Sequence, residues 1–505
     1  MSALRKNILA NYVSQIYSTV IGILVLPFYI KYLGSEAYGL VGFFTMLQIW
    51  FGLLDLGLTP TIGRETALYK GGVTSPLTYL RLHRALSIIF FMIAFIGGSL
   101  LLFLSEYISS HWLKVDSLTP SQVIISIQIM SICVALRWMG GLYRGVVTGS
   151  ECLVWLSNFN IVMATLRTVG VFIAMGYFGF NSLVFFIHQL VIIFAEVIFL
   201  YFKSAQILPK QNQVSEYVGW SLKPIKSVLK FSITLGFTSS VWVLITQSDK
   251  MILSGILTLS EYGVYTLAVL VASGIILVSN PISNAIMPRM ARLYAESNIT
   301  QLISVYCKAT QIVTIIAGTA GIVIIFYGQD LLYSWTGDLI LAKKAAPILQ
   351  LYATGNILLA LISFPYYLQY AKGQLRYHLY GNLIMVILLV PSVVLAAKEF
   401  GAIGAGWVWV CINTFFLIVW VAYIHHKLEP GLHFKWLFKN VLSILVPSFF
   451  IAYIFHADSY NNYDRLESLL LVIKFTIPVF LTALVCSSLA RDVFLTKILK
   501  IRVGL

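Results

Sequence analysis

Charged residues are scarce in this chain of 505 residues: they make up 10% of it, whereas hydrophobic residues make up 59%. Soluble domains carry about 25% charged residues, so these charges are too few to cover an ordinary globular surface. Apolar runs of about twenty residues recur along the whole length, and each could cross about 30 Å of hydrocarbon as a helix. They lack the alternation, in segments of about ten residues, that is typical of a membrane barrel. The sequence therefore predicts an all-helical, polytopic membrane protein.

Cysteine is also scarce, and the motifs of most enzymes are missing. The five cysteines have neither the spacing of a metal site nor the pattern of a disulfide framework. His425, His426 and His433 lie close together with no cysteine or acidic cluster beside them, which favours a solvated basic loop over a metal site. The chain has no nucleophile elbow, no Walker loop and no pair of catalytic carboxylates. We therefore expect no cofactor, no metal and no enzyme activity.

Fourteen apolar runs are expected to span the membrane. The first follows Arg5 and Lys6. It is too long for a signal-peptide core and lacks a small-residue cleavage site, so we expect a retained span. The fourteen spans lie near residues 8–30, 38–60, 84–105, 121–143, 155–176, 182–202, 231–250, 262–285, 308–328, 346–368, 380–397, 402–424, 439–457 and 469–490.

Acidic residues are fewer than basic ones: 19 Asp and Glu stand against 34 Lys and Arg, which gives a net charge of +15. With fourteen spans, most of the basic residues fall in the loops on the side of the N-terminus. Basic loops mark the cytoplasmic side, so we expect both termini to be cytoplasmic. Because no long soluble basic domain is expected, the charge favours an orientation signal and attraction to anionic lipid headgroups over nucleic acid binding.

The two halves of the chain resemble each other. The pairs that carry this repeat, at an offset of about 225 residues, are Ser35-Glu36 with Ser260-Glu261, Tyr38-Gly39 with Tyr262-Gly263, Arg64 with Arg289, Tyr143 with Tyr367, Gly149 with Gly373 and Phe178-Gly179 with Phe400-Gly401. Chance similarity among apolar helices is the alternative, but the common order of the pairs argues against it. Six spans per half is an even number, so the repeats are parallel, as in transporters whose two lobes rock about a central cavity.

The repeat also divides the chain into parts. We expect an N-lobe of spans 1 to 6 over residues 1–203 and a cytoplasmic linker over 204–230. A C-lobe of spans 7 to 12 follows over 231–427. Spans 13 and 14, with a cytoplasmic tail, occupy 428–505 and lie outside the repeat.

Three arginines are candidates for a binding site inside the membrane, where a charge costs on the order of 3 kcal/mol. Arg167 lies roughly 16 Å into its span, so it either faces a cavity and holds an anion or forms a structural pair. Arg137 and Arg144 are seven residues apart and share a helical face. Together the three could form a basic ladder that rises from the cytoplasm. Interfacial snorkelling is the alternative, and it is favoured for Arg144.

Other polar residues of the spans could have either a structural role or a role in transport. Glu196 is the best acidic candidate for coupling to a proton or cation, and Asp55 is a second one for which interfacial pairing is the default. Asn11 and Gln15 fall on one face of the first span and either line a wet cavity or hold helices together. Lys308 is expected to be an orientation charge, with a role as second-lobe counterpart of the arginines as the alternative.

Several segments resemble one known family. They are LPFYIKYLGSEAYG (Leu26 to Gly39), LLDLGLTPTIGRETA (from Leu53), QSDKMILSGILTLSEYGVY (Gln247 to Tyr265) and NAIMPRMARLYAE (from Asn284). They are similar to polysaccharide-repeat flippases of the O-antigen type, in the multidrug/oligosaccharidyl-lipid/polysaccharide (MOP) exporter superfamily. The resemblance implies two six-helix lobes around a central cavity in a bacterial inner membrane. It also implies transfer of an oligosaccharide on undecaprenyl diphosphate from the cytoplasmic to the periplasmic leaflet. The extra pair of spans resembles that of the lipid II flippase, where it is thought to serve the lipid tail.

The chemistry of such a cargo agrees with the arginines. A diphosphate and sugars need a cationic, hydrated cavity, and Arg137, Arg144 and Arg167 supply the charge, although the quoted segments do not contain them. The alternatives are a cation-coupled multidrug antiporter, which relies on buried acids, and a membrane polysaccharide polymerase, which needs larger periplasmic loops. The expected partners are the lipid-linked oligosaccharide, membrane lipids, and a polymerase with its chain-length regulator. We expect a functional monomer that binds no nucleic acid.

Overall fold

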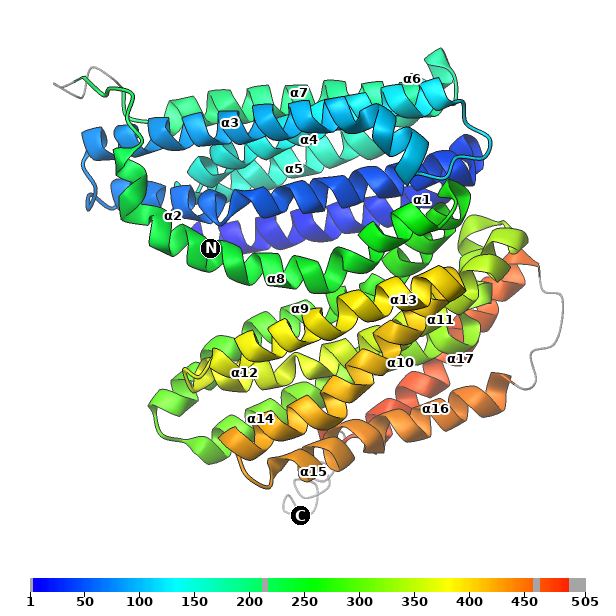
Figure 1. Cartoon of the computed structure of the whole chain (residues 1–505). Coiled ribbons are helices and arrows are strands. Elements are labelled where there is room, and N and C mark those ends of the chain that lie inside the picture. The colour runs from blue at the N-terminus through cyan, green and yellow to red at the C-terminus, as the bar shows by residue number, and fades with distance from the viewer. Residues whose placement is uncertain (1–2, 211–216, 457–463, 490–505) are drawn as a thin grey trace. The chain divides into compact units, whose positions relative to one another are not determined.

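The computed structural model describes residues 3–210, 217–456 and 464–489 (Figure 1). In these residues the chain is helical, and its extended backbone pairing is limited to one isolated bridge between Lys114 and Thr258. By packing, the chain divides into two units, Met1–Gly263 and Val264–Leu505. The prediction of an all-helical fold is therefore confirmed.

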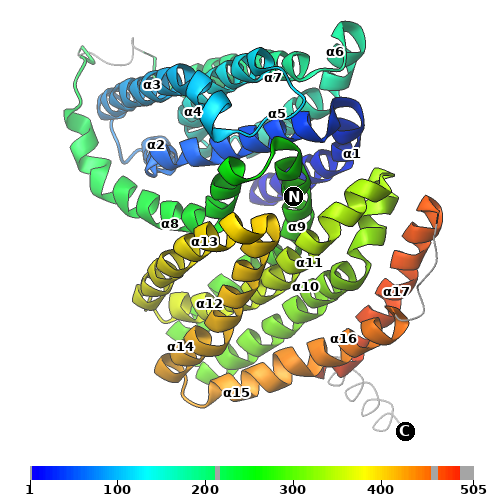
Figure 2. The same cartoon turned by 45° about the vertical axis from the view of Figure 1, so that its right-hand side comes forward.

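The first unit consists of long helices that lie side by side, with α4 against α7 and α1 against α5 (Figures 1 and 2). Its helices are α1 (Ala3–Gly52), α2 (Leu58–Lys70), α3 (Pro76–Tyr107), α4 (Pro120–Gly149), α5 (Leu153–Thr168), α6 (Gly170–Phe178), α7 (Ser182–Ile207) and α8 (Lys226–Ile256), followed by the start of α9 (Leu259–Ala295). α8 belongs to this unit because it packs against α1 and α2. The lobe boundaries expected from the repeat, which place this helix in a C-lobe, stay a prediction.

The second unit continues α9 and contains the appended helix pair. Its helices are α10 (Ile299–Thr336), α11 (Leu339–Ile362), α12 (Phe364–Ala371), α13 (Arg376–Phe415), α14 (Val421–Leu428), α15 (Leu432–Trp436), α16 (Ser443–His456) and α17 (Arg465–Cys486). The last two pack on α10 (Figure 2). Near the start of α16 and the end of α17, Nε2 of Gln311 donates to Oδ1 of Asn440 at 2.6 Å and lies 2.8 Å from the Ser488 hydroxyl. At the other end, Arg465 donates to the carbonyl oxygen of Ser334 at 2.8 Å, so the pair is attached at both ends.

The expected spans match these helices once two merged helices are divided. α1 has 50 residues and would be about 75 Å long as one helix, far more than a bilayer needs. It is interrupted at Gly34, where φ is 84°, and α13 is interrupted in the same way at Gly401, where φ is 58°. Glycine takes this left-handed region without steric cost, so each residue marks the turn between two expected spans. By length and composition, 11 helical segments of the described chain could cross a membrane, and two of them contain such a division.

The second expected span, 38–60, is not continuous. α1 ends at Gly52, and a short 3₁₀ turn over Leu53–Asp55 leads to Leu56 and Gly57, with φ of 44° and 76°. The Asp55 carboxylate then accepts hydrogen bonds from the Thr59 backbone N–H at 3.0 Å and from the Thr59 hydroxyl at 2.8 Å, which holds the first turn of α2. The break lies against α8, where a Cβ at Gly236 would be 2.4 Å from the Leu56 carbonyl carbon.

One histidine of the expected solvated loop is buried in the structure. His425 is fully buried on α14, and its Nε2 lies 2.7 Å from the Tyr306 hydroxyl. Its Nδ1 lies 3.2 Å from Nδ1 of His433, so the expectation of a solvated loop is wrong for His425. The chain turns back at once into α15, which covers the ring. Among the described residues, no group of three or more His, Cys, Asp or Glu could hold a metal ion.

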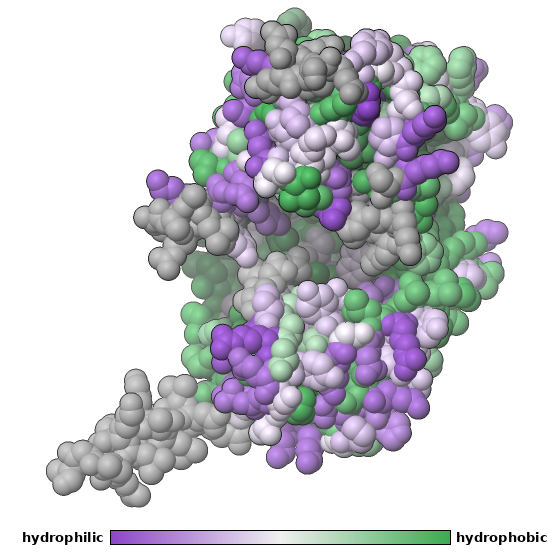
Figure 3. Space-filling model, turned by 90° about the vertical axis from the view of Figure 1, so that its left-hand side faces the viewer, coloured by the Kyte–Doolittle hydropathy of each residue, from purple (hydrophilic) through white to green (hydrophobic). Residues whose placement is uncertain are grey.

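The ends of the helical units are more hydrophilic than their flanks. Figure 3 shows the end of each unit that lies at the left of Figure 1, where hydrophilic side chains gather and hydrophobic ones border them. Basic residues near the ends of helices are exposed in both units: Lys70, Lys223 and Lys226 in the first, and Arg376, Lys427 and Lys435 in the second. The exposed flanks carry many large apolar side chains, such as Phe103 and Ile340, which suits contact with lipid.

Candidate functional site

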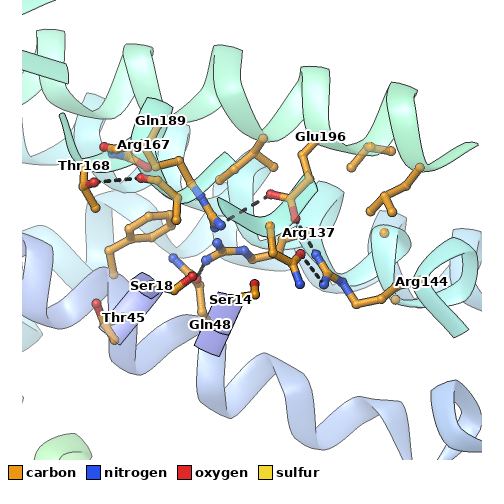
Figure 4. A pocket seen from close by; sticks show the side chains of 18 of the residues that line it. Ser14, Ser18, Thr45, Gln48, Arg137, Arg144, Arg167, Thr168, Gln189 and Glu196 are labelled. Carbon is orange, nitrogen blue, oxygen red and sulfur yellow. Dashed lines mark hydrogen bonds and ion pairs between the residues drawn. The ribbon is translucent and has the colours of Figure 1, made fainter. Parts of the chain in front are cut away.

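A polar cavity of about 890 Å³ lies within the first unit. Its walls come from α1, α4, α5 and α7, so the first, second, fourth, fifth and sixth expected spans all contribute (Figure 4). Its polar and charged lining residues are Asn11, Ser14, Gln15, Ser18, Tyr29, Thr45, Gln48, Arg137, Arg144, Asn160, Arg167, Thr168, Gln189 and Glu196. Polar groups of this number at membrane depth indicate a hydrated site rather than helix packing alone.

Glu196 on α7 bridges two of the arginines. Its Oε1 lies 2.8 Å from Nη2 of Arg144 on α4, and its Oε2 lies 3.7 Å from Nη1 of Arg167 on α5. The carboxylate is 7% exposed, whereas Arg144 and Arg167 keep 34% and 21% of their side chains exposed. A carboxylate buried this deeply needs its cationic partners, because removing one partner of a buried pair leaves an uncompensated charge.

Neutral groups orient the two bridged guanidiniums. Nη1 of Arg144 donates to Oδ1 of Asn160 at 2.8 Å. Nε of Arg167 donates to the carbonyl oxygen of Met163 at 3.3 Å. The carbonyl oxygen of Arg167 in turn accepts a hydrogen bond from Gln189 Nε2 at 2.9 Å, which ties α5 to α7 beside the carboxylate. The geometry therefore leaves part of each guanidinium open to the cavity in a set orientation.

Arg137 is the third arginine, and in the described part of the chain it forms no ion pair. Its Nη1 donates to Oε1 of Gln48 on α1. It lies two turns before Arg144 on α4, and Figure 4 shows the three arginines pointing into the same space. The lining holds three arginines and one glutamate, so 3 − 1 leaves a formal charge of +2. An anion is the charged ligand that this site favours.

Most of the predicted site residues meet here. Arg137, Arg144, Arg167, Asn11 and Gln15 line the cavity together with Glu196. Arg144, for which the sequence favours interfacial snorkelling, lines this cavity and pairs with Glu196, and its depth in the membrane stays a prediction.

Two predicted residues lie elsewhere. Asp55 does not line the main cavity but a smaller pocket beside it, of about 380 Å³. Lys308 is exposed on α10 in the second unit, and its part in a site stays a prediction. Sequence reasoning missed Gln48 and Asn160, the partners of Arg137 and Arg144, although an amide within an apolar span was a signal for both.

This chain is similar to proteins of polysaccharide biosynthesis in sequence and to a lipid flippase in fold. A family model described as polysaccharide biosynthesis protein matches residues 4–294, more than half of the chain. A putative O-antigen transporter of Shigella flexneri is 22% identical over 407 residues, which cover 80% of this chain and 93% of that protein. The structure of the lipid II flippase MurJ in an inward closed conformation superposes with a TM-score of 0.74 at 15% identity, covering 96% of this chain and 100% of that one.

A second solved structure shares the fold. It is an inward-facing multidrug resistance MATE family transporter of the MOP superfamily, with a TM-score of 0.67 at 14% identity. The match covers 82% of this chain and 94% of that one. At these identities the structural likeness shows the fold alone, which these two transporters share, and the predicted MATE-like helical fold is confirmed.

Proposed function

We propose, from the premise that this chain belongs to the family of polysaccharide biosynthesis proteins, that it is a flippase for a lipid-linked oligosaccharide. Its cargo is an oligosaccharide repeat unit on undecaprenyl diphosphate, which it moves from the cytoplasmic to the periplasmic leaflet of the bacterial inner membrane. The observation that carries this proposal is the cavity charge of +2, set by three arginines and one glutamate. The relative in Shigella flexneri is named as an O-antigen transporter, which supports the same class of cargo.

The arginines hold the diphosphate. Guanidinium groups bind phosphate oxygens through two parallel hydrogen bonds, and they do so most strongly away from bulk water. Arg137 has no carboxylate partner in the described chain, so it is the first contact for the incoming anion. Arg144 and Arg167 then exchange Glu196 for phosphate oxygens. The sugars occupy the rest of the hydrated cavity, while the polyprenyl chain stays in the lipid.

Glu196 returns the site to its empty state. It competes with the diphosphate for the same two guanidiniums, so it lowers the affinity and assists release. While the cargo is bound, Glu196 is the group available to take up a coupling proton or cation. A transporter needs a site weak enough to empty, and a carboxylate that competes with the cargo provides this property.

Alternating access is supported by a contact between the repeat-related segments inside the first unit. The hydroxyls of Ser35 and Ser260, an internally matched pair, lie 2.7 Å apart. A Cβ on Gly39 would lie 2.0 Å from the Leu259 carbonyl oxygen, and one on Gly263 would lie 2.4 Å from that of Ser35. These small residues let the two backbones touch, and we propose that the contact closes the periplasmic end and separates when the cavity opens outward.

The remaining proposals concern surroundings and orientation. The basic, hydrophilic ends of both units (Figure 3) face the cytoplasm, and both termini are cytoplasmic, as the basic loops indicate. The protein acts as a monomer without a cofactor and is not an enzyme. A polysaccharide polymerase and a chain-length regulator take over the cargo. Lys308 serves as a cation of the second lobe, and Asp55 is a further candidate for ion coupling.

A multidrug antiporter is the second candidate, because the MATE transporter shares the fold. The test is made in cells that depend on this chain for surface polysaccharide. Arg137→Ala, Arg144→Ala and Arg167→Ala should each abolish the polymer, while Lys398→Ala, which removes an exposed lysine of α13, should not. Normal polymer in the three arginine variants, with altered tolerance to cationic drugs, would favour the antiporter.

A further inference from the structure

The smaller pocket beside the cavity has a composition of its own. Its volume is about 380 Å³, and it lies where the second span breaks, between α1, α2 and α4. It shares Gln48, Arg137 and Gly141 with the main cavity, so the two spaces adjoin at the Arg137 guanidinium. Its size falls in the range of about 300–1,000 Å³ that is usual for small-molecule sites.

Asp55 supplies a hydrogen-bond acceptor to this pocket. Both hydrogen bonds that its carboxylate accepts, from the N–H and the hydroxyl of Thr59, end on Oδ1. In the described part of the chain, Oδ2 accepts none. One oxygen therefore holds the helix start, and the second is left for a group in the pocket.

Trp138 supplies an unused donor. The residue is only 8% exposed, and its indole Nε1 is buried without a hydrogen-bond partner among the described residues. Its ring is fixed by Phe90, with ring centroids 4.3 Å apart, and by Phe51 at 6.3 Å. A buried indole N–H normally finds an acceptor, because leaving it unpaired costs free energy. The ring packs between aromatic neighbours while its polar edge has no partner among the described residues.

The chemistry of these groups selects one class of ligand. A cation is disfavoured because Arg137 stands at the entrance and already uses the Gln48 carbonyl oxygen. A second phosphate is disfavoured by the Asp55 carboxylate. A neutral ring with several hydroxyl groups fits, since it can donate to Oδ2 of Asp55 and lay its apolar edge against Phe51. A small turn of the Trp138 ring toward the pocket would also bring its buried Nε1 to a ring oxygen.

We propose that this pocket is a subsite for a sugar ring of the cargo, the one that lies next to the diphosphate. The assignment rests on the proposed function, in which the arginines of the main cavity bind that diphosphate. Because Arg137 lines both spaces, a sugar attached directly to the phosphate can enter the pocket while the phosphate contacts the guanidinium. The pocket then discriminates among repeat units by their first sugar.

The test compares two kinds of lipid on the purified full chain. The probes are undecaprenyl diphosphate alone and the same lipid carrying one glucose, galactose, N-acetylglucosamine or N-acetylgalactosamine. We expect at least one sugar to tighten binding about fivefold over the bare lipid, the effect of one hydrogen bond. Trp138→Phe keeps the aromatic packing but removes the N–H, and it should bring this ratio close to one. Asp55→Asn, which keeps an oxygen for Thr59, should lower the ratio as well.

Trp50→Phe is the matched control. Trp50 also has a buried Nε1 without a partner but lines neither space, so its replacement should leave the ratio unchanged. Equal binding of all five lipids to the unmodified protein would overturn the sugar subsite and leave the diphosphate site standing. A ratio that survives both Trp138→Phe and Asp55→Asn would also overturn it. If the bare lipid does not bind, the proposed function fails, and this inference fails with it.

Discussion

Replacing Glu196 by glutamine should strengthen cargo binding while it slows transport. The Glu196→Gln variant would keep the size of the side chain but lose the charge that Arg144 binds at 2.8 Å and Arg167 faces at 3.7 Å. Hydrogen bonds to charged groups contribute about 1.5–3 kcal/mol, and the empty protein would no longer spend them on its own carboxylate. We expect affinity for undecaprenyl diphosphate to rise at least tenfold, since about 1.4 kcal/mol corresponds to a factor of ten.

The same substitution should also lower stability. Breaking a fully buried pair costs about 3–5 kcal/mol, and the cost here should be smaller because Arg144 keeps 34% of its side chain exposed. Titration calorimetry on the detergent-solubilised protein measures the affinity, and thermal unfolding measures the stability. Glu429→Gln is the control for the loss of an ion pair as such, because it removes the 2.5 Å pair with Lys372 in the second unit, away from the cavity. Weaker binding in Glu196→Gln than in the unmodified protein would refute the competition between carboxylate and cargo.

Further expectations concern the closing contact and the appended pair. Ser35→Cys combined with Ser260→Cys should form a disulfide under oxidation and stop polymer export until a reductant is added, because the two hydroxyls are 2.7 Å apart; unchanged export by the cross-linked protein would argue against separation of this contact. Gly39→Leu should lower export through steric conflict with the Leu259 carbonyl, whereas Gly22→Leu, with open space around it, should not. Gln311→Leu should lower the free energy of unfolding by about 1–3 kcal/mol, seen as a lower unfolding temperature, because it removes the hydrogen bonds to buried Asn440 and to Ser488; an unchanged temperature would contradict the attachment described for α16 and α17.

The architecture could be predicted from the sequence because its signals are periodic and cumulative. Apolar runs and loop charges specify the number of spans, and a seven-residue spacing places Arg137 and Arg144 on one face of α4. The depth of Arg167 in its span left a cavity role and a structural pair open. In the structure Arg167 lines the cavity and also faces Glu196, while its role in holding an anion stays a prediction.

The details that remained hidden depend on contacts between distant residues. Arg144 and Glu196 are 52 positions apart, and hydropathy patterns contain nothing that joins them. The break after Gly52 depends on Leu56 at a positive φ, which a leucine in an apolar run does not announce. His425 lies in a stretch of basic character, and its burial follows from the close return of α15, a tertiary feature.

The central claim is that the three arginines carry a diphosphate-linked cargo across the membrane. The most direct measurement reconstitutes the full chain in liposomes and follows the transfer of undecaprenyl diphosphate bearing one fluorescently labelled sugar between leaflets. We predict transfer by the unmodified protein and by Lys398→Ala, and loss of transfer when Arg137, Arg144 and Arg167 are replaced together by alanine. Transfer at an unchanged rate in that triple variant would contradict the account.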